Sequence, residues 1–129
     1  MSDFKKLKVW RKAHALALNV HRTAGRMRGT SYSSLRSQMV RAAMSISTNI
    51  VEGTSQQTSR EFARFLRFSL NSASELEYHL IVARDTKAIG LTDFASLSSQ
   101  TEEVRKMLHG LLNAVLLSPR TPKRQVSAS

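Results

Sequence analysis

The residues that break helices are few in this chain and fall at a handful of positions. Proline occurs only at positions 119 and 122, and glycine only at 25, 29, 53, 90 and 110 of the 129 residues. Because proline and glycine are so few, long segments are free of helix-breaking residues, as long helices require. Strict alternation of apolar and polar residues, the pattern of strands, is nowhere sustained. The sequence therefore predicts an all-α fold.

Apolar residues recur at three- and four-residue spacing in four segments, which predicts four amphipathic helices. We expect them over residues 6–25, 33–53, 58–88 and 92–117. The third opens on a capping box, with Thr58 as the N-cap and Glu61 three residues later. Three short connections favour an antiparallel up-and-down four-helix bundle that forms one domain over residues 1–117. The polar, basic and proline-broken residues 118–129 are expected to be a disordered tail.

The second and third predicted helices carry apolar residues on two opposite sides. Because a single bundle buries only one side of each helix, we expect the second side to be covered by further copies of the chain. The alternative is a scatter of surface apolar residues that need no partner. The expected oligomer interface consists of Val40, Met44, Val51, Phe68, Tyr78 and Val82.

A stripe of polar residues runs between these two apolar sides. Arg41 and Glu52 are roughly 16 Å apart along one helix, so they cannot pair with each other. In a helical hairpin, Glu52 could meet Arg60 or Arg64, and Arg41 could meet Ser72 or Glu75. We interpret the stripe as an interhelical polar network that fixes register, with a ligand or nucleic-acid site as the alternative. Its members are Arg41, Ser45, Asn49, Glu52, Arg64, Ser72 and Glu75.

The net charge of +11 is concentrated in the first half of the chain. Residues 1–50 hold ten Lys and Arg against one acidic residue, whereas residues 51–117 hold seven against eight. Clustered cations are typical of proteins that bind polyanions, because each neutralised phosphate releases counterions. A solvated basic face without a ligand is the alternative. The candidate contacts to nucleic acid are Lys5, Lys6, Lys8, Arg11, Lys12, Arg22, Arg26, Arg28, Lys123 and Arg124.

Several kinds of chemistry lack the residues that they need. Without cysteine there is no disulfide, thiolate metal site or thiol nucleophile. The four histidines are dispersed, and the Glu-x-x-His motif of di-metal bundles does not occur. No nucleophile elbow, phosphate-binding glycine loop or dinucleotide fingerprint is found. We therefore expect no metal, no cofactor and no enzymatic activity.

The sequence also contains no run of about 18 apolar residues and no apolar signal segment behind its charged N-terminus. We accordingly expect a cytoplasmic protein without membrane contact.

Four short motifs follow one another in "SLRSQMVRAAMSISTNIVEGTSQQTSREFARFLRFSLNSASELEYHL". They are RAAxSI at 41–46, NIxEG at 49–53, EFxxFL at 61–66 and SxxEL at 72–76. This combination resembles the four-helix-bundle family first noticed as reading frames in intervening sequences of bacterial large-subunit rRNA genes. The opening "FKKLKVWRKAHALALNVH" is also similar, so the resemblance covers residues 4–117. One departure is Val40, which reduces the family's arginine pair to Arg41 alone.

The resemblance implies a four-helix bundle, a relationship to accessory proteins of diversity-generating retroelements, and a ring-shaped homopentamer, but no reaction. Our leading hypothesis is a basic oligomeric module that binds RNA or DNA backbone in support of a ribonucleoprotein or partner enzyme. The alternative is a protein-binding or structural assembly module that does not bind nucleic acid. The sequence shows no aromatic cluster resembling a stacking platform, so we expect no sequence-specific reading of single strands.

Overall fold

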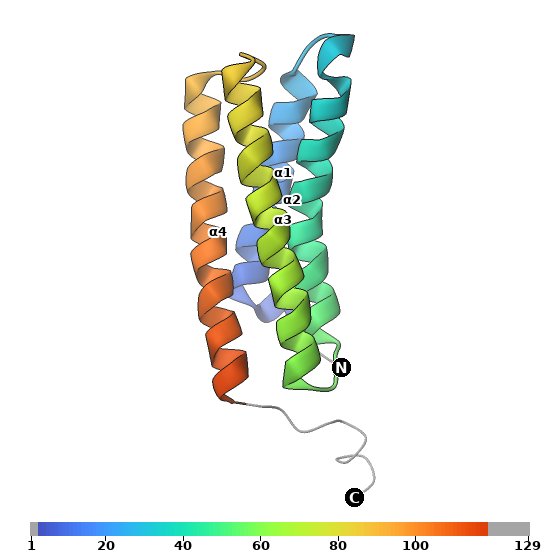
Figure 1. Cartoon of the computed structure of the whole chain (residues 1–129), viewed down its shortest axis with the longest axis vertical. Helices are drawn as coiled ribbons and strands as arrows, with labels where there is room; N and C mark the ends of the chain where they lie inside the picture. The colour runs from blue at the N-terminus through green and yellow to red at the C-terminus, as the bar shows by residue number, and fades with distance from the viewer. Residues whose placement is uncertain (1–2, 119–129) are drawn as a thin grey trace, which may run out of the picture.

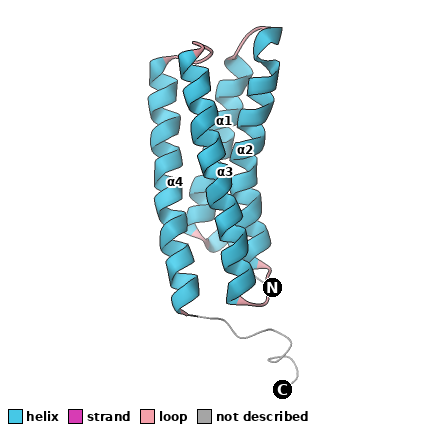
Figure 2. Ribbon diagram, in the orientation of Figure 1, coloured by secondary structure: helices cyan, strands magenta, loops and turns pink. Residues whose placement is uncertain are grey.

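Four long helices make up most of the protein, whose computed structural model describes residues 3–118 (Figures 1 and 2). A single turn of 3₁₀ helix precedes each of the first two helices, and no strand occurs in this part of the chain. The elements are η1 (Phe4–Lys6), α1 (Lys8–Arg26), η2 (Thr30–Tyr32), α2 (Ser33–Thr54), α3 (Ser59–Asp85) and α4 (Leu91–Leu117). The all-α prediction is therefore confirmed. The tail expected at 118–129 lies, after Ser118, outside the described residues.

Successive helices run in opposite directions, and each lies beside the next (Figure 1). The last helix, α4, returns to pack against α1 and closes the bundle. The predicted up-and-down arrangement of four helices is confirmed. With 19 residues, α1 is shorter than α3 and α4, which have 27 each. The chain before α1 is placed by η1, which packs against α2.

Buried apolar side chains from all four helices form one core along the bundle. The apolar stripe predicted for residues 33–53 is buried at Met39, Ala42, Ile46 and Ile50. Leu16 of α1 is also fully buried. Every buried side-chain nitrogen or oxygen in the described part of the chain has a hydrogen-bond partner. The core is thus a packed scaffold in which polar groups are satisfied.

The start of α3 agrees with the predicted boundary, and its end does not. Thr58 is the N-cap, as predicted, and its Oγ1 accepts a hydrogen bond from the Glu61 amide at 3.2 Å. The helix ends at Asp85, three residues before the expected end. Lys87 adopts a left-handed conformation with φ of 63°, and the Ala88 amide donates to the Ala83 carbonyl at 2.8 Å. This is a Schellman motif with lysine in the position that glycine usually takes.

The connection between α1 and α2 is held by one arginine. Arg36 Nη1 donates to the Met27 carbonyl at 2.9 Å and to the Gly29 carbonyl at 3.0 Å. Gly29 has a positive φ of 98°, a conformation that side chains disfavour. The Arg36 guanidinium therefore fixes the loop in which the chain reverses direction.

None of the helices within residues 3–118 combines the length and the apolar character needed to cross a membrane.

Candidate nucleic-acid interface

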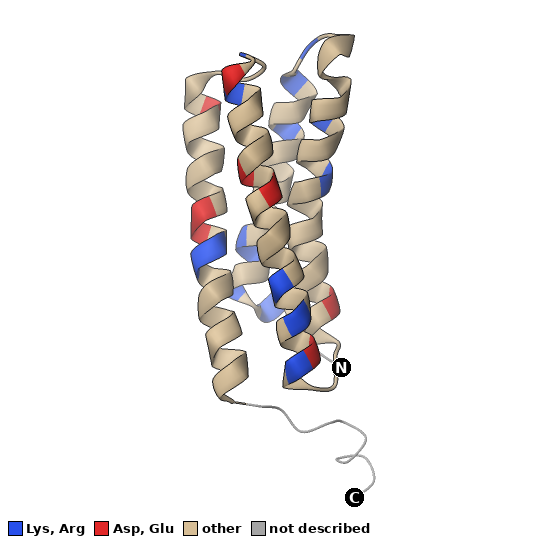
Figure 3. Ribbon diagram, viewed as in Figure 1, with Lys and Arg blue, Asp and Glu red and all other residues tan. Residues whose placement is uncertain are grey.

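The cations singled out in the sequence form two groups instead of one patch. The N-terminal basic cluster consists of Lys5, Lys6, Lys8, Arg11 and Lys12, on η1 and the start of α1. The distal basic cluster consists of Arg22, Arg26 and Arg28, around the end of α1. About 27 Å of helix separates Lys8 from Arg26, and Figure 3 shows basic residues near both ends of α1. Lys123 and Arg124 lie outside the described residues.

Three lysines of the N-terminal basic cluster have no acidic partner in the described part of the chain. Lys5, Lys6 and Lys8 are exposed, and their ammonium groups form no ion pair with any residue in 3–118. Arg11, by contrast, donates from Nη1 to the carbonyls of Lys5 and Lys6 at 3.1 and 3.0 Å, which fastens η1 to α1. Lys12 pairs with Glu103 of α4 at 3.5 Å. Arg11 and Lys12 therefore position the segment, and the three lysines remain available to a ligand.

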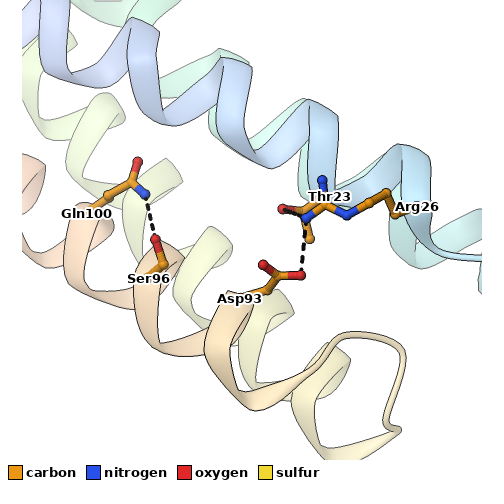
Figure 4. Close-up of polar contacts among 5 residues, drawn as sticks. All are labelled: Thr23, Arg26, Asp93, Ser96 and Gln100. Atoms are coloured by element: carbon orange, nitrogen blue, oxygen red, sulfur yellow. Dashed lines mark hydrogen bonds and ion pairs between the residues drawn. The ribbon is translucent and has the colours of Figure 1, made fainter.

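The distal basic cluster takes part in the contact between α1 and α4. Arg26 Nη2 lies 3.2 Å from Asp93 Oδ2 and 3.5 Å from Thr23 Oγ1 (Figure 4). In the same polar groove, Asn19 Nδ2 donates to Gln100 Oε1 at 2.8 Å. The guanidinium of Arg26 is thus partly neutralised by the helix opposite, and its role in packing competes with a role in binding.

The other two members of the distal basic cluster differ in their contacts. Arg22 donates from Nη1 to the Asn19 side-chain oxygen within its own helix. Arg28 is exposed and forms no ion pair with another described residue. Within residues 3–118, Arg28 is therefore the one member of this cluster whose guanidinium has no polar partner.

Three further exposed cations were not among the predicted contacts to nucleic acid. Arg60 and Arg67 on α3 and Lys106 on α4 make no ion pair within the part of the chain that the structure describes. Basic residues of α1, α3 and α4 gather in the lower half of the bundle, whereas acidic residues of α3 lie mostly above them (Figure 3). The charge count over residues 51–117 did not reveal this separation, because it adds together acidic and basic residues that lie at different levels along α3.

Arg105, next to Lys106, is not available in the same way. Its guanidinium is hydrogen-bonded to Glu102 and lies 3.6 Å from Glu77 of α3. The hydrogen bond that Arg105 donates to Glu102, with the charge of Glu77, raises the pKa of Arg105 above its ordinary value. This arginine ties α4 to α3 and keeps its charge satisfied.

The uncharged members of the predicted polar network join α2 to α3. The hydroxyls of Ser45 and Ser72 lie 2.8 Å apart, and Asn49 Nδ2 donates to the Ser45 carbonyl at 2.9 Å and to its hydroxyl at 3.1 Å. A second interhelical bond, which the sequence analysis did not include, runs from the buried Ser69 hydroxyl to the Ile46 carbonyl at 2.7 Å. Small hydroxyl side chains thus fix the register of the α2–α3 hairpin.

The charged members of the stripe behave differently. Arg41, Glu52 and Glu75 are exposed and form no ion pair with any described residue. The predicted pairing of Glu52 with Arg60 or Arg64 does not form among the described residues. Arg64 instead binds Glu61 at 2.9 Å and lies over the rings of Phe65 and Phe68. Partners for these charges on another copy of the chain stay a prediction.

The second apolar side of α2 and α3 is uncovered in the single chain. Tyr78, Met44 and Phe68 are 63%, 55% and 39% exposed, and Val40, Val51 and Val82 are half-buried. Val40 and Met44 also line a groove of 810 Å³ that extends to the end of α1 and has Arg41 on its rim. These residues lie where the predicted oligomer interface requires them, and the interface itself stays a prediction.

Across residues 3–118, no cluster of three or more histidine or acidic side chains could hold a metal ion.

Comparison with known proteins places these features in a family. The model of the 23S rRNA-intervening sequence protein family matches residues 5–110. A similar fold is found in the crystal structure of a protein with unknown function from the S23 ribosomal protein family of Bacteroides thetaiotaomicron. The two are 24% identical with a TM-score of 0.76, and the match covers 81% of this chain and 97% of the other. No curated protein matches the chain.

Proposed function

The chain belongs to the 23S rRNA-intervening sequence protein family, and from this premise we propose that it is a non-enzymatic, self-associating helical module that binds the phosphate backbone of RNA or DNA. Its role would be to support a ribonucleoprotein or a partner enzyme in the cytoplasm. The observation that carries the proposal is the group of three exposed lysines, Lys5, Lys6 and Lys8, which have no acidic partner among the described residues.

Lysine side chains of this kind suit phosphate contacts that are independent of base sequence. Each is a flexible point charge, and each phosphate that it neutralises releases counterions from the nucleic acid. Further basic residues on α3 and α4 lie in the same half of the bundle as those at the start of α1 and add to the positive field (Figure 3). Contacts to the backbone position a nucleic acid without specifying its sequence, so weak sequence preference is expected.

Salt dependence tests this proposal directly. Fluorescence anisotropy of labelled RNA and DNA is measured between about 50 and 200 mM salt, where each phosphate contact contributes to the slope of log affinity against log salt. Replacing Lys5, Lys6 and Lys8 together by alanine should lower that slope by up to about three units for duplex DNA. Replacing Arg22, Arg26 and Arg28 removes the same charge at the other end of α1 and should lower the slope less.

Two results would count against the proposal. Wild-type protein that binds neither RNA nor DNA at about 50 mM salt would favour the alternative of a protein-binding or assembly module. If the lysine replacements leave the slope of log affinity against log salt unchanged, the N-terminal basic cluster is not part of the interface.

Self-association is supported by a different surface, the uncovered side of the α2–α3 hairpin. Its apolar residues are accompanied by Arg41, Glu52 and Glu75, which have no partner among residues 3–118. The groove that Arg41 lines is formed by residues of α1 and α2, whereas the exposed Glu75 and Tyr78 lie on α3. Contacts between two different surfaces generate rings when the rotation closes, which agrees with the homopentamer that we expect.

Light scattering on the purified protein at micromolar concentration tests the assembly. We expect the mass of a closed ring, with five copies as the expected number. A monomer under these conditions would refute the self-association part of the proposal and leave nucleic-acid binding to be judged on its own.

A further inference from the structure

Three ring side chains that are separate in the sequence come together where the chain enters the bundle. Phe4 on η1 packs its ring edge-on against Trp10 of α1, with centroids 4.9 Å apart and an interplanar angle of 68°. One turn further along α1, the imidazole of His14 stacks on Trp10 with centroids 5.0 Å apart and an angle of 5°. We call these three residues the aromatic column. The sequence analysis did not recognise it, although the four-residue spacing of Trp10 and His14 places them on one helix face.

The column is anchored at its middle ring, Trp10, and is open to solvent at His14. Trp10 is half-buried and packs against the hydrophobic core, while His14 is exposed. Leu18, a further turn along, is 43% exposed and continues the same helix face. The half-buried Trp10 thus supports the imidazole of His14, and solvent reaches that imidazole.

Three lysines close to the column in sequence lack an acidic partner among residues 3–118. Lys8 precedes Trp10 by two residues, and Lys5 and Lys6 follow Phe4 directly, all three exposed and without an ion pair among the described residues. Arg11 holds η1 against α1 through the carbonyls of Lys5 and Lys6, so the lysines and the rings are kept together. The arrangement combines positive charge with an aromatic surface, which is how proteins hold single-stranded nucleic acid.

Paired bases cannot use such a surface, because their faces are already covered by their neighbours in the duplex. An unpaired base offers a bare ring, and stacking on an aromatic side chain favours any base because every base has a π-face. We infer that Trp10 and His14 form a stacking site for an unpaired base of a single-stranded nucleic acid whose phosphates are held by Lys5, Lys6 and Lys8. This inference rests on the proposed function and specifies the class of nucleic acid.

The protein carries its own probe for this site, since Trp10 is its one tryptophan. The full chain is titrated with a 15-residue oligo(dT) and with a duplex of equal length at the same salt concentration, while Trp10 fluorescence and anisotropy are recorded. The single strand should bind more tightly than the duplex and should change the Trp10 emission. His14→Ala should lower the affinity for the single strand by about 5- to 150-fold and leave the affinity for the duplex unchanged.

Two variants separate stacking from other effects. His14→Phe keeps an aromatic face and should retain most of the single-strand affinity. His109→Ala removes an exposed histidine from α4 and should have no effect on either ligand. Circular dichroism should show the same helix content in all of them, because both histidines are exposed.

The possible failures are distinguishable. Binding to both ligands that His14→Ala leaves unchanged, or tight single-strand binding without a change in Trp10 emission, would overturn the stacking site and leave the proposed function standing. Failure of the wild-type protein to bind any RNA or DNA would overturn both.

Discussion

Gly53 of α2 lies against the ring of Phe62 of α3, and the contact leaves no room for a side chain on the glycine. A Cβ atom on residue 53 would stand 2.9 Å from Cδ1 of Phe62 and 3.2 Å from Cβ of Phe65. Gly53 is buried, and it is the last residue of the NIxEG motif. The glycine of that motif therefore serves the close approach of two helices.

We predict that Gly53→Ala destabilises the fold by about 1–3 kcal/mol, because the added methyl overpacks the contact with Phe62. Gly110→Ala is the matched control, since a Cβ at this exposed position of α4 meets nothing within 4 Å. There the change should stabilise by about 0.5–1 kcal/mol through better helix propensity. Urea unfolding followed by circular dichroism measures both, and equal effects at the two glycines would contradict the packing argument.

Lys87 gives a prediction of opposite sign. It occupies the left-handed position after α3 with φ of 63°, where a side chain is strained. Lys87→Gly should relieve this strain and stabilise the protein by about 0.5–1 kcal/mol despite the greater flexibility of unfolded glycine. Lys106→Gly, inside α4, should instead destabilise by about 1 kcal/mol. A loss of stability in both variants would show that the strain at residue 87 is negligible.

Replacing Arg36 tests whether its hydrogen bonds stabilise the α1–α2 connection. Arg36→Ala leaves the carbonyls of Met27 and Gly29 without their charged donor and should cost about 1.5–3 kcal/mol. Arg28→Ala removes an exposed arginine from the same loop and should change stability by less than about 0.5 kcal/mol. Thermal unfolding of the two variants side by side gives the comparison, and matching midpoints would refute the role of Arg36.

Charge reversal tests whether Arg41 meets an acidic residue of another copy. Arg41→Glu should weaken the assembly seen by light scattering, because like charges would then face each other across the interface. Reversing both charges, with Arg41→Glu and Glu75→Arg in one chain, should restore it if these two residues are partners. Because both side chains are exposed in the single chain, helix content should not change. If Arg41→Glu weakens the assembly and the double variant does not restore it, Arg41 has a different partner.

Most of the fold could be predicted because the same pattern specified both the helices and their contacts. The spacing of Met39, Ala42, Ile46 and Ile50 predicted a buried stripe, and glycine and proline marked the connections. What failed was the end of α3, since a lysine at residue 87 takes a conformation for which the sequence carries no signal. Propensity predicts where a helix can continue, but a local hydrogen-bond motif decides where it stops.

The candidate site was predicted less well, because it depends on distance in space. The sequence grouped Lys5 with Arg26 by charge alone, whereas the helix places them at different ends of the bundle. Arg60 and Arg67 were not among the predicted contacts, because acidic residues further along α3 balanced their charges in the count. Which cations are neutralised, as Arg26 is by Asp93, follows from the packing of α4 on α1 and cannot be read from either helix.

The order in which the helices meet has a consequence for how the chain folds. Each of α1, α2 and α3 packs on the helix that follows it, so most tertiary contacts close only short loops. Such a low contact order favours rapid folding, because little chain entropy is lost before the contacts begin to stabilise the structure. The exception is the return of α4 to α1, where Lys12 meets Glu103 across most of the chain. We therefore expect the docking of α4 on α1 to complete folding after the hairpins have formed.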